Sequence, residues 1–235
     1  MLVDLTHPFS DGMFSLRLFP RVTVERCVRI EERRINVTRV EFAVHAGTHL
    51  DAPRHFLPDG KTVEQLALED VSGPAVALAV RRAGGEEITV ADLADASPTV
   101  RPGDIVFVST DWARYFYGDP ERYRDHPYLS REAAEWLVER RVKLIGVDVP
   151  TPDQPEWRRA PGFDWPVHHI LLGHGVLVAE HVNNLQLVVG KRFRVFAFPI
   201  PIRDSDGSPV RIVAEVPDDE PAAAGRERGR AGVAR

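Results

Sequence analysis

The sequence predicts a mixed α/β domain with many strands, and three observations support this fold class. Segments with the two-residue period of strands alternate with segments that begin at helix-capping residues. The 235 residues are 43% hydrophobic and 28% charged, which is ordinary for a globular domain with one core. No unit of about 20 to 50 residues repeats, which argues against solenoids and propellers.

Strand and helix signals follow one another in order along the chain. In the first clear strand, Val40, Phe42 and Val44 alternate with other residues, and this strand runs directly into residues 45–56. Short apolar runs predict later strands at residues 75–80, 105–109, 143–149, 176–182, 193–198 and 210–215. Helices are expected from about residue 63 and at 88–96, 131–141 and 167–172, the first three after the capping residues Thr62, Thr89 and Ser130.

One domain is predicted to span residues 1–216. Residues 217–235 contain a single large aliphatic residue, so they cannot bury enough surface to offset the entropy of ordering, and we expect a disordered C-terminal tail. Residues 148–166 contain five prolines and little periodicity. A long structured loop of this kind in a compact domain is usually functional.

Composition excludes several classes of protein. The net charge is -5 and basic residues are not clustered, so a nucleic-acid partner is not expected. The longest apolar stretches are far shorter than the roughly 20 residues of a membrane span, and the first residues do not resemble a secretory signal, so the expected location is the cytoplasm, without a membrane partner. The only cysteine, Cys27, is expected to be a small core residue. The glycine motifs of dinucleotide-binding and P-loop folds do not occur.

The strongest functional signal is a group of metal-ligand residues in the segment H-A-G-T-H-L-D-A-P-R-H-F at 45–56. His45, His49 and His55 lie within eleven residues, with Asp51 between them. Imidazole and carboxylate groups bind zinc, manganese or iron at neutral pH. Gly47 permits a close backbone bend, so a rigid loop at a strand end is expected to turn alternate side chains toward one point.

A metal site also needs partners from elsewhere in the chain. The candidates are all in residues 167–182: His168, His169, His174, Glu180 and His181. Glu180 lies in an otherwise apolar strand, where a carboxylate is costly to bury unless a positive group meets it. A metal ion would be such a group.

Together these segments resemble the metal-dependent cyclase-like hydrolases, a family that includes kynurenine formamidases and isatin hydrolases. The resemblance rests on H-x-G-T-H-x-D-x-P-x-H-F at 45–56 and on H-x-x-L-L from His168, which Glu180 follows twelve residues later. Residues 4–8, 125–148 and 206–211 support it, so it covers nearly all of the folded part. It implies a cyclase/kynurenine formamidase-like fold: a β-barrel-like mixed sheet core with peripheral helices.

The resemblance also implies a role for each site residue. His45, His49 and Asp51 match the ligands of one metal ion, and His168 matches a ligand of a second. Asp51 and Glu180 match the carboxylates that touch both ions in two-metal members. The implied cofactor is therefore a divalent metal, zinc or manganese, with one or two ions per subunit. The implied assembly is a homodimer or homotetramer.

The implied reaction is hydrolysis of a carbon–nitrogen bond in a small amide, imide or lactam. In this reading His55 matches the histidine that takes a proton from water and delivers it to the leaving nitrogen. His169 is expected to pack beside the site, whereas His174 and His181 are expected to have no role in it.

Residues 11–21 depart from the family pattern because they contain no tryptophan. Phe14 or Phe19 can supply the missing aromatic group, and Trp157 and Trp165 flank the proline-rich loop. Two alternatives to the hydrolase remain at this point: a metal-dependent cyclase or dehydratase that acts on a polyketide-like substrate, and a metal-stabilised binding protein without turnover.

Overall fold

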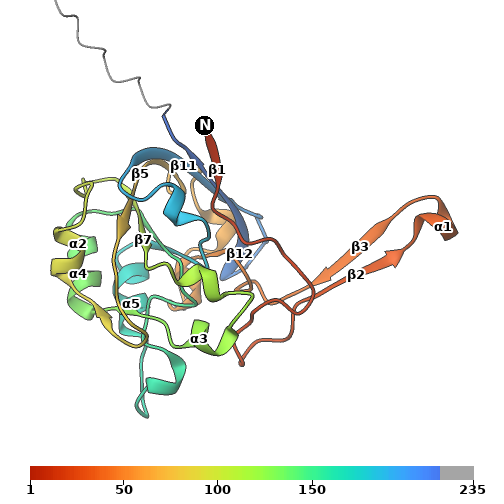
Figure 1. The fold of residues 1–235 in the computed structure, drawn as a ribbon, viewed down its shortest axis with the longest axis horizontal. Helices are drawn as coiled ribbons and strands as arrows, with labels where there is room; N and C mark the ends of the chain where they lie inside the picture. The colour runs from red at the N-terminus through yellow and green to blue at the C-terminus, as the bar shows by residue number, and fades with distance from the viewer. Residues whose placement is uncertain (218–235) are drawn as a thin grey trace, which may run out of the picture.

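The computed structural model describes residues 1–217, and its centre is a sheet that closes on itself (Figure 1). The strand order is β1-β12-β11-β5-β7-β9-β10-β4, and β4 also pairs with β12, so that seven strands form a barrel and β1 lies beside β12. The strands are β1 Leu2–Asp4, β4 His49–Asp51, β5 Ser72–Ala79, β7 Ile105–Ser109, β9 Leu144–Val147, β10 Leu177–Glu180, β11 Arg192–Pro199 and β12 Gly207–Glu215.

The remaining elements are short. The helices are α1 Ile30–Arg33, α2 Val90–Ala94, α3 Pro120–Arg124, α4 Arg131–Glu139 and α5 Pro166–Gly173. The 3₁₀ turns are η1 Pro53–His55, η2 Val63–Gln65, η3 Trp112–Tyr115, η4 Glu156–Arg158 and η5 Leu185–Leu187. Two small sheets pair β2 Thr23–Val28 with β3 Val37–Glu41, and β6 Glu87–Ile88 with β8 Tyr128–Leu129. No helix within residues 1–217 is long and apolar enough to cross a membrane.

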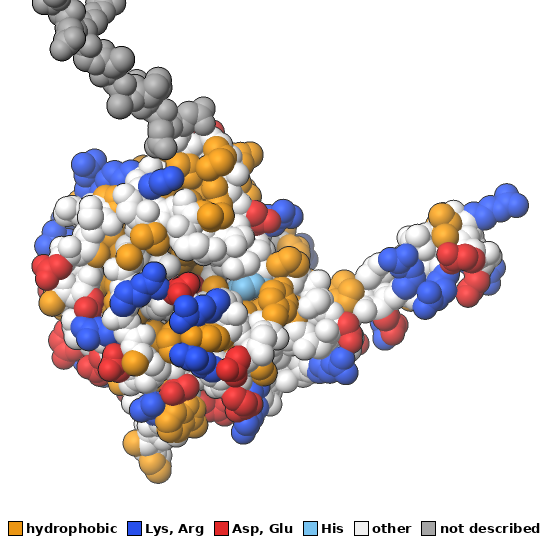
Figure 2. Space-filling view, in the orientation of Figure 1, with side chains coloured by type: hydrophobic (Ala, Val, Ile, Leu, Met, Phe, Trp, Pro, Cys, Tyr) orange, Lys and Arg blue, Asp and Glu red, His pale blue; other side chains and the backbone are white. Residues whose placement is uncertain are grey.

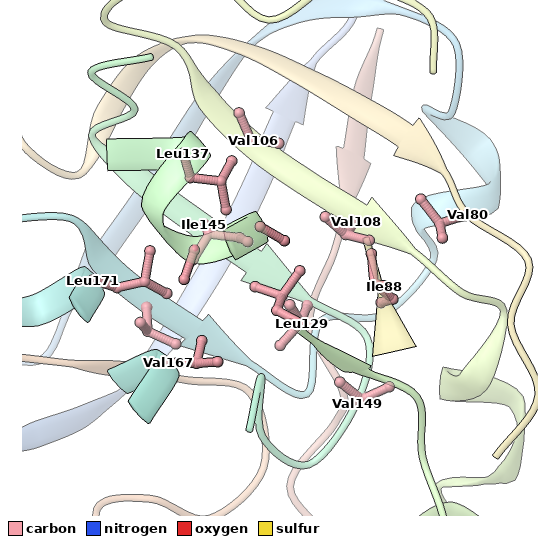
Figure 3. Close-up of a cluster of buried hydrophobic side chains, with 14 of the residues drawn as sticks. Val80, Ile88, Val106, Val108, Leu129, Leu137, Ile145, Val149, Val167 and Leu171 are labelled. Atoms are coloured by element: carbon pink, nitrogen blue, oxygen red, sulfur yellow. The ribbon is translucent and has the colours of Figure 1, made fainter. Parts of the chain in front are cut away.

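Strands β5, β7, β9 and β10 are parallel, and helices cover their outer face. Every residue of β7, β9 and β10 is buried, which explains why these segments read as continuous apolar runs. Alternate side chains enter two cores. Ile105 and Phe107 pack inside the barrel with residues from all seven strands, whereas Val106 and Val108 pack outward. Figure 3 shows the outer core, where Leu137 of α4 and Leu171 of α5 lie over Val106 and Ile145.

The predicted helix caps are present. The hydroxyl of Ser130 accepts the amide of Ala133 at 3.1 Å, and Thr89 takes part in a capping box with Asp92. The amide of Thr62 donates to Gln65 Oε1 at 3.1 Å, which is one half of the predicted capping box, but the segment after it makes only the single turn η2. The mixed α/β, barrel-like fold predicted for the chain is confirmed. The predicted boundary at 216/217 stays a prediction, because all but the first residue of the predicted tail lies outside the described residues.

Two predictions for residues 27–44 were wrong. The alternating segment at 40–44 is not a core strand that runs into the histidine motif. β3 ends at Glu41, and with β2 and α1 it forms a hairpin that projects from the body; every residue of β3 is exposed. Cys27 lies on this projecting hairpin and is exposed rather than part of the core. Alternation with a period of two residues predicts a strand, but it does not predict whether the rest of the protein covers that strand.

Candidate metal centre and active site

The site begins at the short strand β4, whose three residues are all buried. Because successive side chains of a strand point to opposite faces, His49 and Asp51 share one face while Leu50 enters the barrel core. β4 lies between β10 and the first residues of β12, and its register places His49 directly opposite Glu180. The His49, Asp51 and Glu180 side chains are therefore gathered on the outer face of the barrel.

His45, His49 and Asp51 form the first group of ligand atoms. His45 Nδ1 lies 2.8 Å from Asp51 Oδ1, and His49 Nε2 lies 3.3 Å from the same oxygen. His49 Nδ1 lies 2.8 Å from the carbonyl oxygen of Gly47; a carbonyl can only accept, so Nδ1 carries the proton and Nε2 faces the carboxylates. Gly47 has a φ of 63°, which favours glycine, and a Cβ there would lie 2.8 Å from Met13.

His168 brings a second group of ligand atoms from α5. Its Nε2 lies 3.4 Å from Asp51 Oδ2 and 3.2 Å from Glu180 Oε1. Its Nδ1 lies 2.6 Å from Asp153 Oδ2, and the two carboxylate oxygens of Asp153 also accept the amides of Val167 and His168. Asp153 therefore caps the start of α5 and fixes the ring of His168 with Nε2 toward the other ligand atoms.

The donor set fits a divalent cation. His45, His49 and Asp51 form one group whose ligand atoms all lie within 4.8 Å of one another, and Asp51, His168 and Glu180 form another. His49 Nε2 and Asp51 Oδ2 are buried and have no hydrogen-bond partner within residues 1–217, although such atoms are normally satisfied. Three imidazoles and two carboxylates are ligands that zinc and manganese accept. The cluster therefore suggests a divalent metal.

Electrostatics supports the same conclusion. Burial by itself would lower the pKa of His49, but the adjacent carboxylates of Asp51 and Glu180 raise it to about 10. Burial would raise the pKa of Glu180, and so would the negative charge of Asp51, but the contacts with His168 and His49 lower it to about 2. Two buried carboxylates thus strongly attract positive charge to this point, which a metal ion can supply.

His55 lies beside this cluster rather than within it. Its ring stacks on His45 with centroids 3.9 Å apart, and its side chain is 25% exposed. Its Nδ1 lies 3.2 Å from Asp206 Oδ2, the same oxygen that lies 2.8 Å from His45 Nε2. Because a carboxylate only accepts hydrogen bonds, Asp206 holds the protons of both rings on the nitrogens that face it. Burial lowers the pKa of His55.

The next residue after Asp206 lets His45 approach the sheet. Gly207 begins β12 and pairs with Asp51 across the ladder. A Cβ at Gly207 would lie 2.5 Å from His45 Cε1 and 3.1 Å from the Leu50 carbonyl oxygen. Any larger residue at this position would displace the His45 ring or the strand.

A cavity of about 1100 Å³ opens in front of the cluster. His45, His55, His168 and Glu180 line one part of it, and Phe19, Phe56, Phe163, Trp157 and Trp165 supply aromatic walls. Three arginines also line it: Arg17, Arg124 and Arg159. Figure 2 shows histidine surface near the middle of this face, between hydrophobic and basic side chains. A cavity of this size accommodates a small aromatic molecule.

The structure brings together all six residues that the sequence predicts for the site: His45, His49, Asp51, His55, His168 and Glu180. His169 is exposed and packs edge-on against Phe56, and His174 is exposed outside the cluster. Of the candidate aromatics, Phe19, Trp157 and Trp165 line the cavity, whereas Phe14 is buried against Tyr123.

Sequence reasoning missed Asp153 and Asp206 as site residues and gave His181 no role. A ligand atom of His181 lies within 4.8 Å of those of His49 and Glu180, and its Nδ1 is 2.9 Å from the Tyr123 hydroxyl. An acidic residue in a proline-rich loop gives no local signal of its partner. Residues 206–211 contributed only to the resemblance, so the contact between Asp206 and His45 could not be foreseen.

A closed barrel with histidines and carboxylates at the base of an aromatic cavity defines a class of protein, the metal-dependent hydrolases. Comparisons with known proteins specify the family. Residues 3–154 match the Cyclase family, described as "Putative cyclase". The kynurenine formamidase of Bacillus cytotoxicus is 31% identical over 188 residues, covering 80% of this chain and 83% of that protein. That of Bacillus cereus is 33% identical over 184 residues, covering 78% and 81%. The chain belongs to the Cyclase family.

A solved structure agrees with this assignment. Isatin hydrolase A from Ralstonia solanacearum matches with a TM-score of 0.82 and 26% identity, covering 92% of each chain. The predicted family is therefore confirmed, and so is the prediction of a metal-dependent hydrolase of carbon–nitrogen bonds outside peptides. These relatives favour neither the cyclase or dehydratase alternative nor the non-catalytic one. They also imply a small-molecule substrate.

Proposed function

We propose that this protein hydrolyses an aryl formamide or an aromatic lactam or imide, with the two ligand groups holding one or two zinc or manganese ions. The observation that carries the proposal is the convergence of His49, Asp51, His168 and Glu180 at the base of an aromatic-lined cavity. The relatives support the substrate class, because one is named for a formamide and another for isatin, a cyclic amide.

The ligand assignment follows the geometry. His45 through Nδ1, His49 through Nε2 and Asp51 would hold one ion; His168 through Nε2, Glu180 and the second oxygen of Asp51 would hold another. A bound divalent ion supplies Lewis acidity, which polarises a carbonyl and makes water more acidic. Asp206 and Asp153 orient His45 and His168 through their other ring nitrogens, as outer-shell carboxylates do.

His55 is the residue that moves protons. Asp206 keeps a proton on its Nδ1, so its Nε2 carries a lone pair. In the forward reaction Nε2 takes a proton from the attacking water and then gives it to the leaving nitrogen, which is otherwise a poor leaving group. The aromatic walls, including Phe56 and Trp165, hold the ring of the substrate and shield the site from bulk water.

We also propose that the protein acts in the cytoplasm as a homodimer or homotetramer. Its only cysteine is exposed and forms no disulfide, which suits a reducing compartment. The projecting hairpin exposes Ile35, Val37 and Val40, which are 57%, 42% and 43% exposed. A two-stranded ribbon is marginally stable alone, and a second subunit would cover these side chains. Light scattering after size-exclusion chromatography measures the assembly.

The first test measures turnover by the zinc- or manganese-reconstituted protein on one panel: N-formylkynurenine, isatin, and simple cyclic imides and lactams. We expect turnover of at least one aromatic member and its loss on addition of a chelator. His55→Ala should lower kcat by about 10²- to 10⁴-fold without changing the metal content. His174→Ala is the matched control, because His174 is exposed and lies outside the cluster. Silence of the whole panel with metal bound, or loss of metal in His55→Ala, would refute the proposal.

A further inference from the structure

The cavity contains a positive group that the proposed reaction does not use. Arg159 follows η4 in the proline-rich loop and is half-buried among the cavity walls. Its Nε donates to the carbonyl oxygen of Gln154 at 2.8 Å. Its guanidinium lies 5.0 Å from the ring centre of Phe163 and 5.1 Å from that of Trp165, so stacking holds it in place.

The three cavity arginines differ in their partners. Arg124 bonds to Glu121 at 2.6 Å, and Arg17 lies 3.7 Å from the same carboxylate. Arg159 makes no ion pair with any residue of 1–217, and neither terminal nitrogen of its guanidinium has a hydrogen bond there. A guanidinium offers five donors, of which only Nε–H is used. The two terminal nitrogens, whose donors are unused, have the spacing that binds both oxygens of a carboxylate.

The nearest acidic groups do not satisfy Arg159. Asp153 is already bonded to His168 and to two amides of α5, and Glu156 is exposed and outside ion-pair distance. Burial lowers the pKa of Arg159, while the charges of Asp153, Glu156 and Glu180 oppose this change. An arginine stays protonated in either case. The cavity therefore holds a fixed positive charge beside aromatic walls.

We propose that Arg159 binds a carboxylate of the substrate, so that the enzyme prefers aromatic amides that carry an anionic side chain. This inference rests on the proposed hydrolase function and names its substrate class more closely. The aromatic body lies against Phe56, Phe163 and Trp165, with the scissile amide at the histidine cluster. The carboxylate pairs with the two terminal nitrogens of Arg159. A cavity of about 1100 Å³ is large enough for an aromatic ring with such a side chain.

The test compares N-formylkynurenine with its methyl ester, which differ by one negative charge, in the metal-loaded wild type and in Arg159→Gln. The wild type should have a lower KM for the acid than for the ester. Arg159→Gln should raise KM for the acid by about 10- to 100-fold, change kcat little, and change KM for the ester by less than about 3-fold. Arg159→Lys should keep part of the preference, because a lysine keeps the charge but loses the planar fork.

The matched control is Arg158→Gln. Arg158 precedes Arg159 in the same loop but pairs with Asp125 at 3.0 Å and does not line the cavity. This variant removes the same charge and should keep the preference for the acid. The inference is overturned if Arg159→Gln weakens acid and ester equally, if it weakens neither, or if Arg158→Gln produces the same change.

A binding measurement separates this inference from the reaction itself. Calorimetric titration of the metal-loaded protein with 4-phenylbutyrate and with neutral 4-phenylbutanamide requires no turnover. The acid should bind more tightly to the wild type, and Arg159→Gln should remove that difference. If the wild type turns over neither formamide but shows this difference, the proposed function fails and the anion site stands. If turnover occurs and Arg159→Gln keeps both the kinetic preference for the acid over its ester and the tighter binding of 4-phenylbutyrate, the anion site is refuted and the proposed function stands.

Discussion

Asp153→Asn tests whether an acidic residue far from the histidine motif controls the metal site. The wild-type carboxylate accepts three hydrogen bonds: from the amides of Val167 and His168 at 3.0 and 3.1 Å, and from His168 Nδ1 at 2.6 Å. An asparagine has only one acceptor oxygen. It keeps the most bonds by turning that oxygen to His168, which leaves its NH₂ group facing the amide of Val167.

The expected magnitudes follow from this rearrangement. The bond to His168 Nδ1 changes from charge-assisted to neutral, a loss of about 1 to 1.5 kcal/mol, which is about 10-fold in metal affinity. The buried amide of Val167 loses its acceptor, which costs a further 1 to 3 kcal/mol or so of folding free energy. The first effect lowers the metal affinity, whereas the second lowers the stability of the metal-free protein and leaves the metal affinity unchanged.

Two assays measure these effects. Competition with a chromophoric chelator gives the metal affinity, and urea unfolding of the metal-free protein gives the stability. Asp92→Asn is the control, because Asp92 caps α2 and pairs with Arg82 away from the site, so it should lower stability without changing metal affinity. Unchanged metal affinity in Asp153→Asn, with the expected loss of stability, would show that Asp153 only caps α5 and would refute the reasoning.

Three further predictions concern other parts of the molecule. Asp206→Asn should lower kcat by about 10-fold or more and metal affinity by about 10-fold, because Asp206 orients both His55 and His45; a change in neither kinetics nor chelator competition would remove its positioning role. Burial lowers the pKa of His7 from 6.5 to about 4 in the folded protein. The unfolded chain therefore takes up a proton first as the pH falls. The contribution of His7 to the free energy of unfolding is complete above pH 6.5 and should fall by about 3 kcal/mol toward pH 4. Urea unfolding at pH 7 and pH 5 should show a smaller fall in His7→Phe, and an equal fall would contradict this. Gly146→Ala should lower the melting temperature by several degrees, because its Cβ would lie 2.3 Å from the ring of Phe107; Gly118→Ala, which meets nothing within 4 Å, should not.

The sequence predicts most of the secondary structure of the body because local rules decide it. Continuous apolar runs identify strands that are buried on both faces, as for β7 at residues 105–109. The cap at Ser130 marks the start of α4 because its side chain bonds to an amide only three residues away. The prediction for residues 40–44 was wrong because alternation does not show whether a two-stranded ribbon packs on a core or projects from it. Its exposure depends on the whole molecule.

The sequence by itself determines the chemistry of this protein: three histidines and an aspartate within one short segment. The two-residue period of a strand is sufficient to place His49 and Asp51 on one face. Only the tertiary structure decides which distant residues contact this segment. Barrel closure between β4, β10 and β12 brings Glu180 opposite His49, and the fold brings Asp206 to His45 across 161 positions of sequence. The loop that carries Asp153 and Arg159 then sets the orientation of His168 and adds an arginine to the cavity wall. These contacts join distant segments, and their energies depend on burial and geometry that no local pattern contains.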